Sequence, residues 1–166
     1  MADRELYELA ERAGRVLVER GLMVATAESC TGGWVAGALT MMPGSSAWCE
    51  RGFVTYTYVS KREMLGVRSA TLEAHGAVSE AVVREMVAGA LASSHAQVAL
   101  AVSGTAGPSG GTPEKPVGTV CLAWGKKDFE PVSETQHFAG DREAVRRLSV
   151  VRALKVLIET VENATP

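Results

Sequence analysis

A hydroxyl, a thiol and two adjacent glycines follow directly after an apolar run in the segment Glu28-Ser29-Cys30-Thr31-Gly32-Gly33. A serine on a strand-to-helix turn is a candidate nucleophile, because the backbone N–H groups after it can hold a developing oxyanion. Glycines in such a turn leave the approach to the serine open. The alternative is structural, since Ser and Thr are ordinary helix N-caps and a Gly-Gly pair allows close packing of helix on sheet. Cys30 is a second candidate nucleophile, although a buried and inert cysteine is the favoured interpretation.

A serine nucleophile needs a base, which this chain can draw from three histidines and five lysines. His75, His95 and His137 fall at expected helix ends and in an expected edge strand, so a Ser-His-Asp triad has little support. Lys61 follows the apolar segment 52–58 and is flanked by apolar residues. Partial burial lowers the pKa of a lysine and lets it act as a base. The competing interpretation of Lys61 is a charge on a surface helix.

A second segment with backbone chemistry is the long Gly/Pro loop 103–116, which reads SGTAGPSGGTPEKP. Its exposed N–H groups can cradle a phosphate, but it is neither a Walker A loop nor a GxGxxG fingerprint. A mobile surface loop is the alternative, although a loop of this length is more often functional than idle. The pair Arg146-Arg147 near the C-terminus is interpreted as a solvated helix face rather than an anion site.

Helices and strands alternate in the first part of the chain, and a strand pair joined by a hairpin lies near its end. Hydrophobic periodicity predicts helices over 3–20, 34–42, 61–65, 71–75, 80–94 and 142–162, with Ser60, Ser79 and Asp141 as N-caps of the third, fifth and sixth. Strands are predicted over 22–27, 52–58, 98–102, 117–124 and 132–138. This order predicts a single-domain three-layer α/β/α sandwich with a mixed sheet. Ligands in such folds bind at the carboxyl ends of strands, so Ser29 and the loop 103–116 should border one cleft.

Composition narrows the class of protein without naming a function. A chain of 166 residues with 46% apolar and 22% charged residues is typical of one globular domain. Its 17 basic and 19 acidic residues give a net charge of −2, which argues against a nucleic-acid binder. Three widely spaced cysteines argue against a disulfide framework or a zinc site. No long apolar run and no secretory signal are present, so no membrane association is expected and the cytoplasm is the predicted compartment.

Several unusual motifs together resemble one family. They are TAESCTGGWVAG (26–37), PGSSAWCERGFVTY (43–56), HGAVSE (75–80), SGTAGPSGGTPEKPVGTV (103–120) and GDREAVRR (140–147). The chain resembles the CinA C-terminal domain family over nearly all of residues 1–166, in the form of its stand-alone nicotinamide-nucleotide amidases. The resemblance implies hydrolysis of the carboxamide of nicotinamide mononucleotide to nicotinate mononucleotide and ammonia, in pyridine-nucleotide salvage. It implies a small-molecule nucleotide substrate, no metal and no cofactor, and a homodimer is an expectation from the same source.

The same resemblance assigns roles to individual residues. It places a Ser-Lys dyad at Ser29 and Lys61, assisted by Tyr56. The backbone N–H groups of residues 30–33 would hold the oxyanion. The nucleotide would lie against Thr105 and the neighbouring glycines Gly104 and Gly107.

One stretch departs from the family pattern. The family motif Y-S-N-x-x-K corresponds here to Tyr56-Thr57-Tyr58-Val59-Ser60-Lys61, so Tyr58 stands where the family has an asparagine. A bulky phenol beside the implied base leaves two alternatives open. One is a non-catalytic nucleotide-binding or regulatory paralog, and the other is an amidase for a different small amide.

Overall fold

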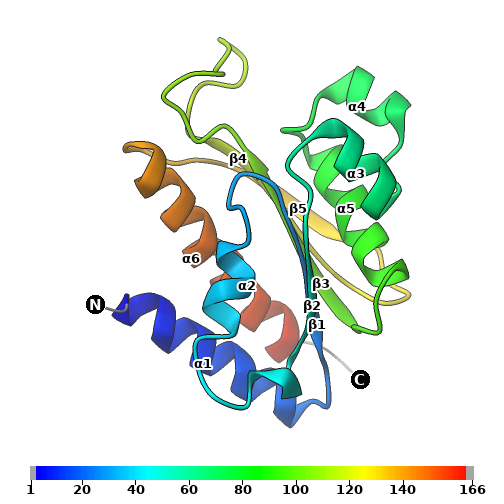
Figure 1. The fold of residues 1–166 in the computed structure, drawn as a ribbon, viewed down its shortest axis with the longest axis vertical. Helices are drawn as coiled ribbons and strands as arrows, with labels where there is room; N and C mark the ends of the chain where they lie inside the picture. Colours follow the sequence, from blue (N-terminus) through cyan, green and yellow to red (C-terminus); the bar gives the residue numbers. More distant parts are fainter. Residues whose placement is uncertain (1–2, 164–166) are drawn as a thin grey trace.

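Two layers of helices cover the two faces of a five-stranded sheet in the computed structural model, which describes residues 3–163 (Figure 1). The strands are β1 (Val24–Glu28), β2 (Cys49–Val54), β3 (Val98–Gly104), β4 (Thr119–Lys126) and β5 (Val132–His137). The helices are α1 (Arg4–Glu19), α2 (Trp34–Leu39), α3 (Tyr58–Leu65), α4 (Ser69–His75), α5 (Glu80–Ala92) and α6 (Arg142–Glu162), with a 3-10 turn, η1, at Ser45–Ala47. None of the helices in this described part of the chain is long and apolar enough to span a membrane. The predicted three-layer α/β/α sandwich is confirmed.

The sheet is mixed, as the sequence predicts, with strand order β2-β1-β3-β4-β5. β1 runs parallel to β2 and β3, whereas β4 is antiparallel to β3 and to β5. The last residue of β1, Glu28, is in register with Val54 of β2 and Val102 of β3. Because the three parallel strands end together, the residues that follow them emerge at one edge of the sheet, where ligands bind in this class of fold.

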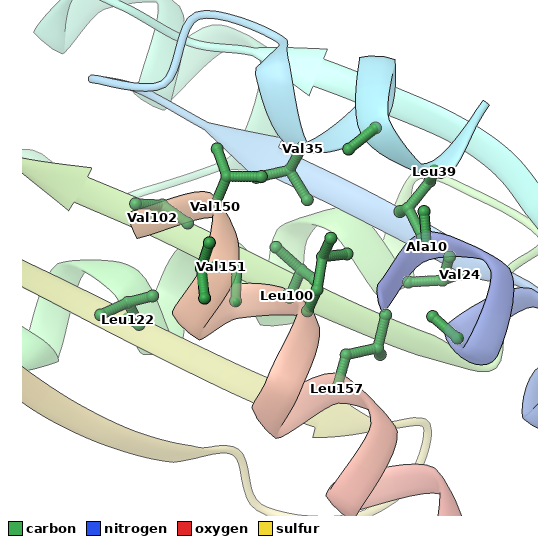
Figure 2. Packing of buried hydrophobic residues seen from close by; sticks show 14 of the residues in the cluster. Ala10, Val24, Val35, Leu39, Leu100, Val102, Leu122, Val150, Val151 and Leu157 are labelled. Carbon is green, nitrogen blue, oxygen red and sulfur yellow. The ribbon is translucent and has the colours of Figure 1, made fainter. Parts of the chain in front are cut away.

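One face of the sheet packs against α1, α2 and α6, and this interface forms the larger core (Figure 2). Aliphatic side chains of the strands and of the three helices interdigitate there, among them Val24, Leu100, Val102, Leu122, Ala10, Val35, Leu39, Val150, Val151 and Leu157. The buried indole of Trp124 donates to the Ala153 carbonyl at 3.0 Å and so ties β4 to α6. This core fixes the position of α6 relative to the end of β1.

The other face of the sheet is lined mainly by alanines, so the layer of α3, α4 and α5 approaches it closely (Figure 1). These are Ala25, Ala27, Ala99, Ala101 and Ala123. The helices of this layer are also close to each other, because a Cβ on Gly89 of α5 would lie only 1.9 Å from the carbonyl oxygen of Leu65 at the end of α3. Small residues therefore hold α3, which carries Lys61, near the end of β1.

The segment between β2 and α3 differs from the prediction. The expected strand 52–58 ends at Val54, and α3 begins at Tyr58 rather than after an N-cap at Ser60. The reason is a capping box, in which the Thr57 hydroxyl accepts the Ser60 N–H at 3.1 Å and the Ser60 hydroxyl accepts the Thr57 N–H at 3.0 Å. The helix therefore starts one turn earlier than predicted, and Lys61 is an integral part of it. The N-caps predicted at Ser79 and Asp141 are confirmed.

Candidate active site

A cavity of about 190 Å³ opens at the carboxyl ends of β1 and β3. Its walls come from segments that lie far apart in the sequence: Ser29, Cys30, Tyr56, Lys61, Ala77, Val78, Ser103, Gly104, Ala106 and Arg142. Ser29 and the start of the glycine-rich loop thus border one cleft, as the sequence predicts. No histidine is among these lining residues, so a Ser-His-Asp triad has no base here.

Ser29 and Lys61 are in direct contact. The Lys61 Nζ donates to the Ser29 Oγ at 2.8 Å and to the Thr55 carbonyl oxygen at 2.7 Å. Lys61 is only 1% exposed, so its interpretation as a charge on a surface helix is wrong. Burial lowers the pKa of Lys61 to about 8, because an ammonium ion loses its hydration there, and no carboxylate in the described part of the chain pairs with it. An amine with this pKa beside a serine hydroxyl can act as a general base near neutral pH.

The turn that follows Ser29 is fixed by its own hydrogen bonds. The Ser29 N–H donates to the Val102 carbonyl of β3 at 2.9 Å, and the Gly32 N–H donates to the Ser29 carbonyl at 3.0 Å. Gly32 and Gly33 have φ angles of +58° and +100°, which side chains with a Cβ rarely adopt. The two glycines are therefore needed for the turn itself, in addition to leaving space beside the serine.

Glu28, which sequence reasoning did not assign, caps the helix behind the nucleophile. Its carboxylate is completely buried and accepts hydrogen bonds from the Thr31 hydroxyl at 2.6 Å and from the N–H groups of Val35 and Ala36 at 2.8 and 3.0 Å. The N-cap position of α2 is Gly33, which has no side chain to offer, so the strand supplies the cap. The sequence does carry a signal for this role: an acidic residue ends an apolar strand, and the helix that follows is preceded by a glycine, which has no side chain to cap it.

This arrangement changes which N–H groups remain for an oxyanion. Those of Val35 and Ala36 point at Glu28, and that of Gly32 is used within the turn. Within residues 3–163, the N–H groups of Cys30, Thr31 and Gly33 donate to no other residue, and that of Cys30 interacts with its own thiol. Of the residues predicted to contact substrate here, Cys30 lines the cavity, whereas Thr31, Gly32 and Gly33 form the turn behind it.

Tyr56 and Arg142 form one wall of the cavity. The Tyr56 hydroxyl accepts a hydrogen bond from the Arg142 Nη2 at 3.0 Å, and the Arg142 Nη1 donates to the Gly107 carbonyl at 2.8 Å. Arg142 was not assigned from the sequence, although it lies in the motif GDREAVRR at the start of α6. Its guanidinium connects the Tyr56 segment, the glycine-rich loop and α6 at the mouth of the site.

Tyr58 is turned away from the catalytic pair. It does not line the cavity, it is 52% exposed, and its hydroxyl accepts the Ala77 N–H at 3.2 Å. The residue that departs from the family pattern therefore leaves the contact between Ser29 and Lys61 unobstructed.

Only the beginning of the glycine-rich loop reaches the site. Gly104 and Ala106 line the cavity, and Thr105 is held by backbone hydrogen bonds to Thr119 and Gly118 at 2.9 and 2.8 Å. Gly107 contributes its carbonyl to Arg142 rather than to the cavity lining. Residues 108–114 are exposed to solvent and lie outside the site, so the loop is divided into a fixed start and an exposed tip.

The predicted solvated face at Arg146-Arg147 is wrong, because both guanidiniums have protein partners. The Arg146 Nε donates to the Cys30 carbonyl at 3.0 Å, and its Nη2 donates to the Thr31 carbonyl at 3.3 Å. The Arg147 Nη2 donates to Asp3 at 3.0 Å and to Glu5 at 2.8 Å, which joins α6 to α1. Arg146 therefore binds the nucleophile turn, whereas the adjacent Arg147 binds the N-terminal end of α1.

Cys30 fits its interpretation as an inert thiol. It is 5% exposed, and burial raises its pKa to about 11, so the reactive thiolate is scarce at neutral pH. Within residues 3–163, no group of three or more His, Cys, Asp and Glu side chains is arranged to hold a metal ion.

Comparison with known proteins places the chain in a family. Residues 6–161 match the model of the CinA C-terminal domain. The chain belongs to the CinA C-terminal domain family. This CinA domain is 54% identical over 157 residues to the nicotinamide-nucleotide amidohydrolase PncC of Escherichia coli K12, covering 95% of both chains. It is also 54% identical over 151 residues to the protein of the same name from Pseudomonas putida, covering 91% of this chain and 94% of that one.

Solved structures agree with the assignment. The CinA domain described here superposes on the competence/damage inducible protein CihA of Agrobacterium tumefaciens with a TM-score of 0.94 and 45% sequence identity. That match covers 98% of this chain and 99% of the other.

Proposed function

We propose that this CinA domain is a nicotinamide-nucleotide amidohydrolase that converts nicotinamide mononucleotide and water to nicotinate mononucleotide and ammonia, in pyridine-nucleotide salvage. The observation that carries the proposal is the contact of 2.8 Å between the Lys61 Nζ and the Ser29 Oγ inside a cavity. The relatives named nicotinamide-nucleotide amidohydrolase PncC match nearly the full chain and support this choice of substrate.

The direction of proton transfer follows from the Thr55 carbonyl. A carbonyl oxygen only accepts hydrogen bonds, so a neutral Lys61 has to donate one N–H to it at 2.7 Å. The lone pair of the amine is then free to accept the hydroxyl proton of Ser29. The neutral dyad is thereby arranged with the serine as donor and the lysine as acceptor, which nucleophilic attack requires.

In the acylation step, the Ser29 Oγ forms a bond to the carboxamide carbon while its proton passes to the Lys61 Nζ. The π electron pair of the carbonyl moves onto the oxygen, which the N–H groups of Cys30 and Thr31 stabilise. When the carbonyl re-forms, the C–N bond breaks and the nitrogen takes the proton from Lys61, relayed by the Tyr56 hydroxyl. Ammonia leaves, and an ester joins nicotinate mononucleotide to Ser29.

The deacylation step repeats these transfers with water. Lys61, neutral again, takes a proton from water as the water oxygen attacks the ester carbon. Collapse of the second oxyanion breaks the bond to the Ser29 Oγ, which recovers its proton from Lys61. The products are nicotinate mononucleotide and the original enzyme, so atoms and charges balance over the cycle.

The nucleotide part of the substrate would lie at the start of the loop, near Gly104, Thr105 and Gly107; of these three only Gly104 lines the cavity, beside Arg142. Arg142 brings a guanidinium to the cavity lining, and a guanidinium with unused N–H donors binds a phosphate well. A single local cation of this kind suits a mononucleotide, and the chain as a whole, with a net charge of −2, does not attract polyanions.

The test is release of ammonia from nicotinamide mononucleotide by the unmodified protein and by the Ser29→Ala and Lys61→Met variants. The unmodified protein should turn over the substrate, and each variant should lose about 10⁴-fold or more in kcat. Full activity in either variant would contradict the dyad. Tight binding of the nucleotide by calorimetry without ammonia release would instead support the non-catalytic paralog, and the Tyr58→Asn variant, which restores the family residue, would then be expected to gain activity.

A further inference from the structure

Arg146 connects helix α6 to the backbone of the nucleophile turn without lining the cavity. Its Nε and Nη2 donate to two consecutive carbonyl oxygens, those of Cys30 and Thr31, at 3.0 and 3.3 Å. The guanidinium lies over the ring of Trp34, 5.5 Å from the centroid, in a cation–π contact. A Cβ on Gly32 would lie 3.5 Å from the Nη2, so the turn and the guanidinium are closely apposed. The guanidinium is thus held by the two carbonyl oxygens that accept its N–H groups and by the Trp34 ring that it lies over.

The two contacts determine where the amide N–H groups of the turn point. In a trans peptide the C=O and the following N–H are antiparallel, and all peptides of this turn are trans. Because Arg146 draws the Cys30 carbonyl toward α6, the Thr31 N–H of the same peptide is directed away from α6. Lys61 reaches Ser29 on that opposite side, so this N–H faces the same side of the turn as the Lys61–Ser29 contact, although Thr31 itself does not line the cavity.

The second contact acts through one further hydrogen bond. Arg146 holds the Thr31 carbonyl, whose peptide carries the Gly32 N–H, and this N–H donates to the Ser29 carbonyl at 3.0 Å. The peptide that contains the Ser29 carbonyl also contains the Cys30 N–H. One guanidinium therefore orients two of the three turn N–H groups that donate to no other residue within 3–163, those of Cys30 and Thr31; the third is that of Gly33.

The charge of Arg146 acts in the same direction. No carboxylate within residues 3–163 forms an ion pair with it, whereas the adjacent Arg147 pairs with Asp3 and Glu5. A cation behind the two carbonyls polarises their peptides: it increases the positive charge on the Thr31 N–H directly, and it acts on the peptide of the Cys30 N–H only through the hydrogen bond from Gly32 to the Ser29 carbonyl.

We propose that Arg146 is a positioning residue that builds the oxyanion hole of this enzyme by orienting the N–H groups of Cys30 and Thr31. The inference rests on the proposed acyl transfer at Ser29, but it does not depend on which amide is the substrate. The layer of α1, α2 and α6 would then contribute to transition-state stabilisation through Arg146 of α6.

The experiment compares Arg146→Gln with Arg147→Gln, a matched loss of one guanidinium from the next position of the same helix. Removal of an oxyanion donor costs about 10²- to 10³-fold in kcat, so Arg146→Gln should lose about 100-fold in kcat with KM changed less than about threefold. Arg147→Gln should keep kcat within about twofold, because the partners of Arg147 are the N-cap Asp3 and Glu5 of α1 and not the turn. Arg146→Lys should not restore activity, since an ammonium cannot bridge two carbonyls as a planar fork does.

A thioamide substrate distinguishes orientation of the hole from general damage. Sulfur is larger and a weaker hydrogen-bond acceptor than oxygen, so an intact hole favours nicotinamide mononucleotide over its thioamide analogue. We expect this preference in kcat/KM to fall about tenfold in Arg146→Gln and to stay unchanged in Arg147→Gln. An unchanged preference in Arg146→Gln, or equal losses in both variants that follow their thermal unfolding midpoints, would overturn the proposal.

Reaction of Ser29 with a fluorophosphonate, followed by intact mass, separates this inference from the choice of substrate. The probe needs the nucleophile and the oxyanion hole but no nicotinamide, and Arg146→Gln should react at least about tenfold more slowly than the unmodified protein. Labelling of Ser29 without ammonia release would contradict the proposed substrate. The labelling rates of Arg146→Gln and of the unmodified protein would still test the role of Arg146. Equal labelling rates in the two proteins would overturn that role, and a protein that neither reacts with the probe nor releases ammonia would overturn both proposals.

Discussion

The two glycine-rich segments of this domain, the nucleophile turn 29–33 and the loop 105–118, resemble each other in sequence and differ in structure. Both follow a parallel strand, and both contain glycines with positive φ. The turn is held from three directions, by β3 through the Ser29 N–H, by Glu28 and by Arg146. The loop is held at its two ends and through Lys115, which donates to the His75 carbonyl and bonds to Thr112, whereas its tip, residues 108–114, is exposed.

The difference shows what makes a glycine-rich backbone suitable for catalysis. Glycine permits an unusual φ, but it does not by itself keep the backbone in one conformation. In the turn, other elements supply donors to the carbonyls and an acceptor for the helix amides, so one conformation is maintained. The loop tip is exposed to solvent, and its hydrogen bonds within residues 3–163 are local ones between Thr112 and Lys115, so fewer contacts restrict its backbone.

The largest contrast is expected between Lys61, which contacts the turn from α3, and Lys115, which belongs to the loop. Lys61→Met should abolish turnover, whereas Lys115→Met, which loses one hydrogen bond to the His75 carbonyl, should keep it within a few-fold. In the unmodified protein, kcat/KM should rise about tenfold per pH unit below the Lys61 pKa of about 8 and level off above it, since only the neutral amine is a base. A pH–rate profile that is flat between pH 6 and 9 would contradict this role.

The same group should make stability depend on pH. Because burial lowers the pKa of Lys61 in the folded state to about 8 from its ordinary 10.5, the unfolded chain binds more protons between these values. The free energy of unfolding should therefore increase as the pH rises from 8 to 10.5, by about 3 kcal/mol at most, and Lys61→Met should lack this increase. Urea unfolding of both proteins at pH 7.5 and 10 measures the difference between them.

The next contrast is between two glutamates, Glu28 at the end of β1, which binds the turn, and Glu114 in the loop. Glu28→Gln replaces an acceptor of three hydrogen bonds by an amide that cannot accept all of them, and should cost about 2 kcal/mol of stability with a clear loss in kcat. Glu114→Gln, in the exposed loop tip, should change stability by less than about 0.5 kcal/mol. Equal unfolding midpoints for the two variants would show that the cap at Glu28 contributes nothing.

The smallest contrast concerns two glycines in nearly the same conformation. Gly33 and Gly110 have φ angles of +100° and +94°, and an added Cβ would meet a methyl group at 3.5 Å in each case. Alanine should cost about 1–2 kcal/mol at Gly33, where the turn cannot adjust, and less than about 0.5 kcal/mol at Gly110, where the loop can relax. The reverse order in chemical denaturation would show that the loop tip is as strongly held as the turn.

Much of the fold is predictable from local patterns, because periodicity and strand-end position need no knowledge of partners. The helix pattern of α1, the buried runs of β1 and β3 and the caps at Ser79 and Asp141 all agree with the structure. The same reasoning brings Ser29 and the loop start to one edge. The error at α3 arose because Thr57 and Ser60 are both capping residues, and only their mutual hydrogen bonds decide which one begins the helix.

The residues that complete the site could not be found in this way. Glu28, Arg142 and Arg146 act through partners that are determined by tertiary packing, and two of the three bind backbone carbonyls that carry no sequence signal. The orientation of Tyr58 is likewise decided by the Ala77 N–H, a contact between segments that local patterns do not connect.

Cys30 has a consequence for the chemical durability of the enzyme. A thiol beside a serine nucleophile would ordinarily expose the site to peroxide and to alkylating agents, since the thiolate is the form that reacts. Here a pKa of about 11 leaves roughly one thiolate in 10⁴ molecules at pH 7, even though Cys30 lines the cavity. Turnover should therefore persist under oxidative conditions that inactivate cysteine hydrolases, and a covalent inhibitor of this site should react with the hydroxyl of Ser29 rather than with the thiol of Cys30.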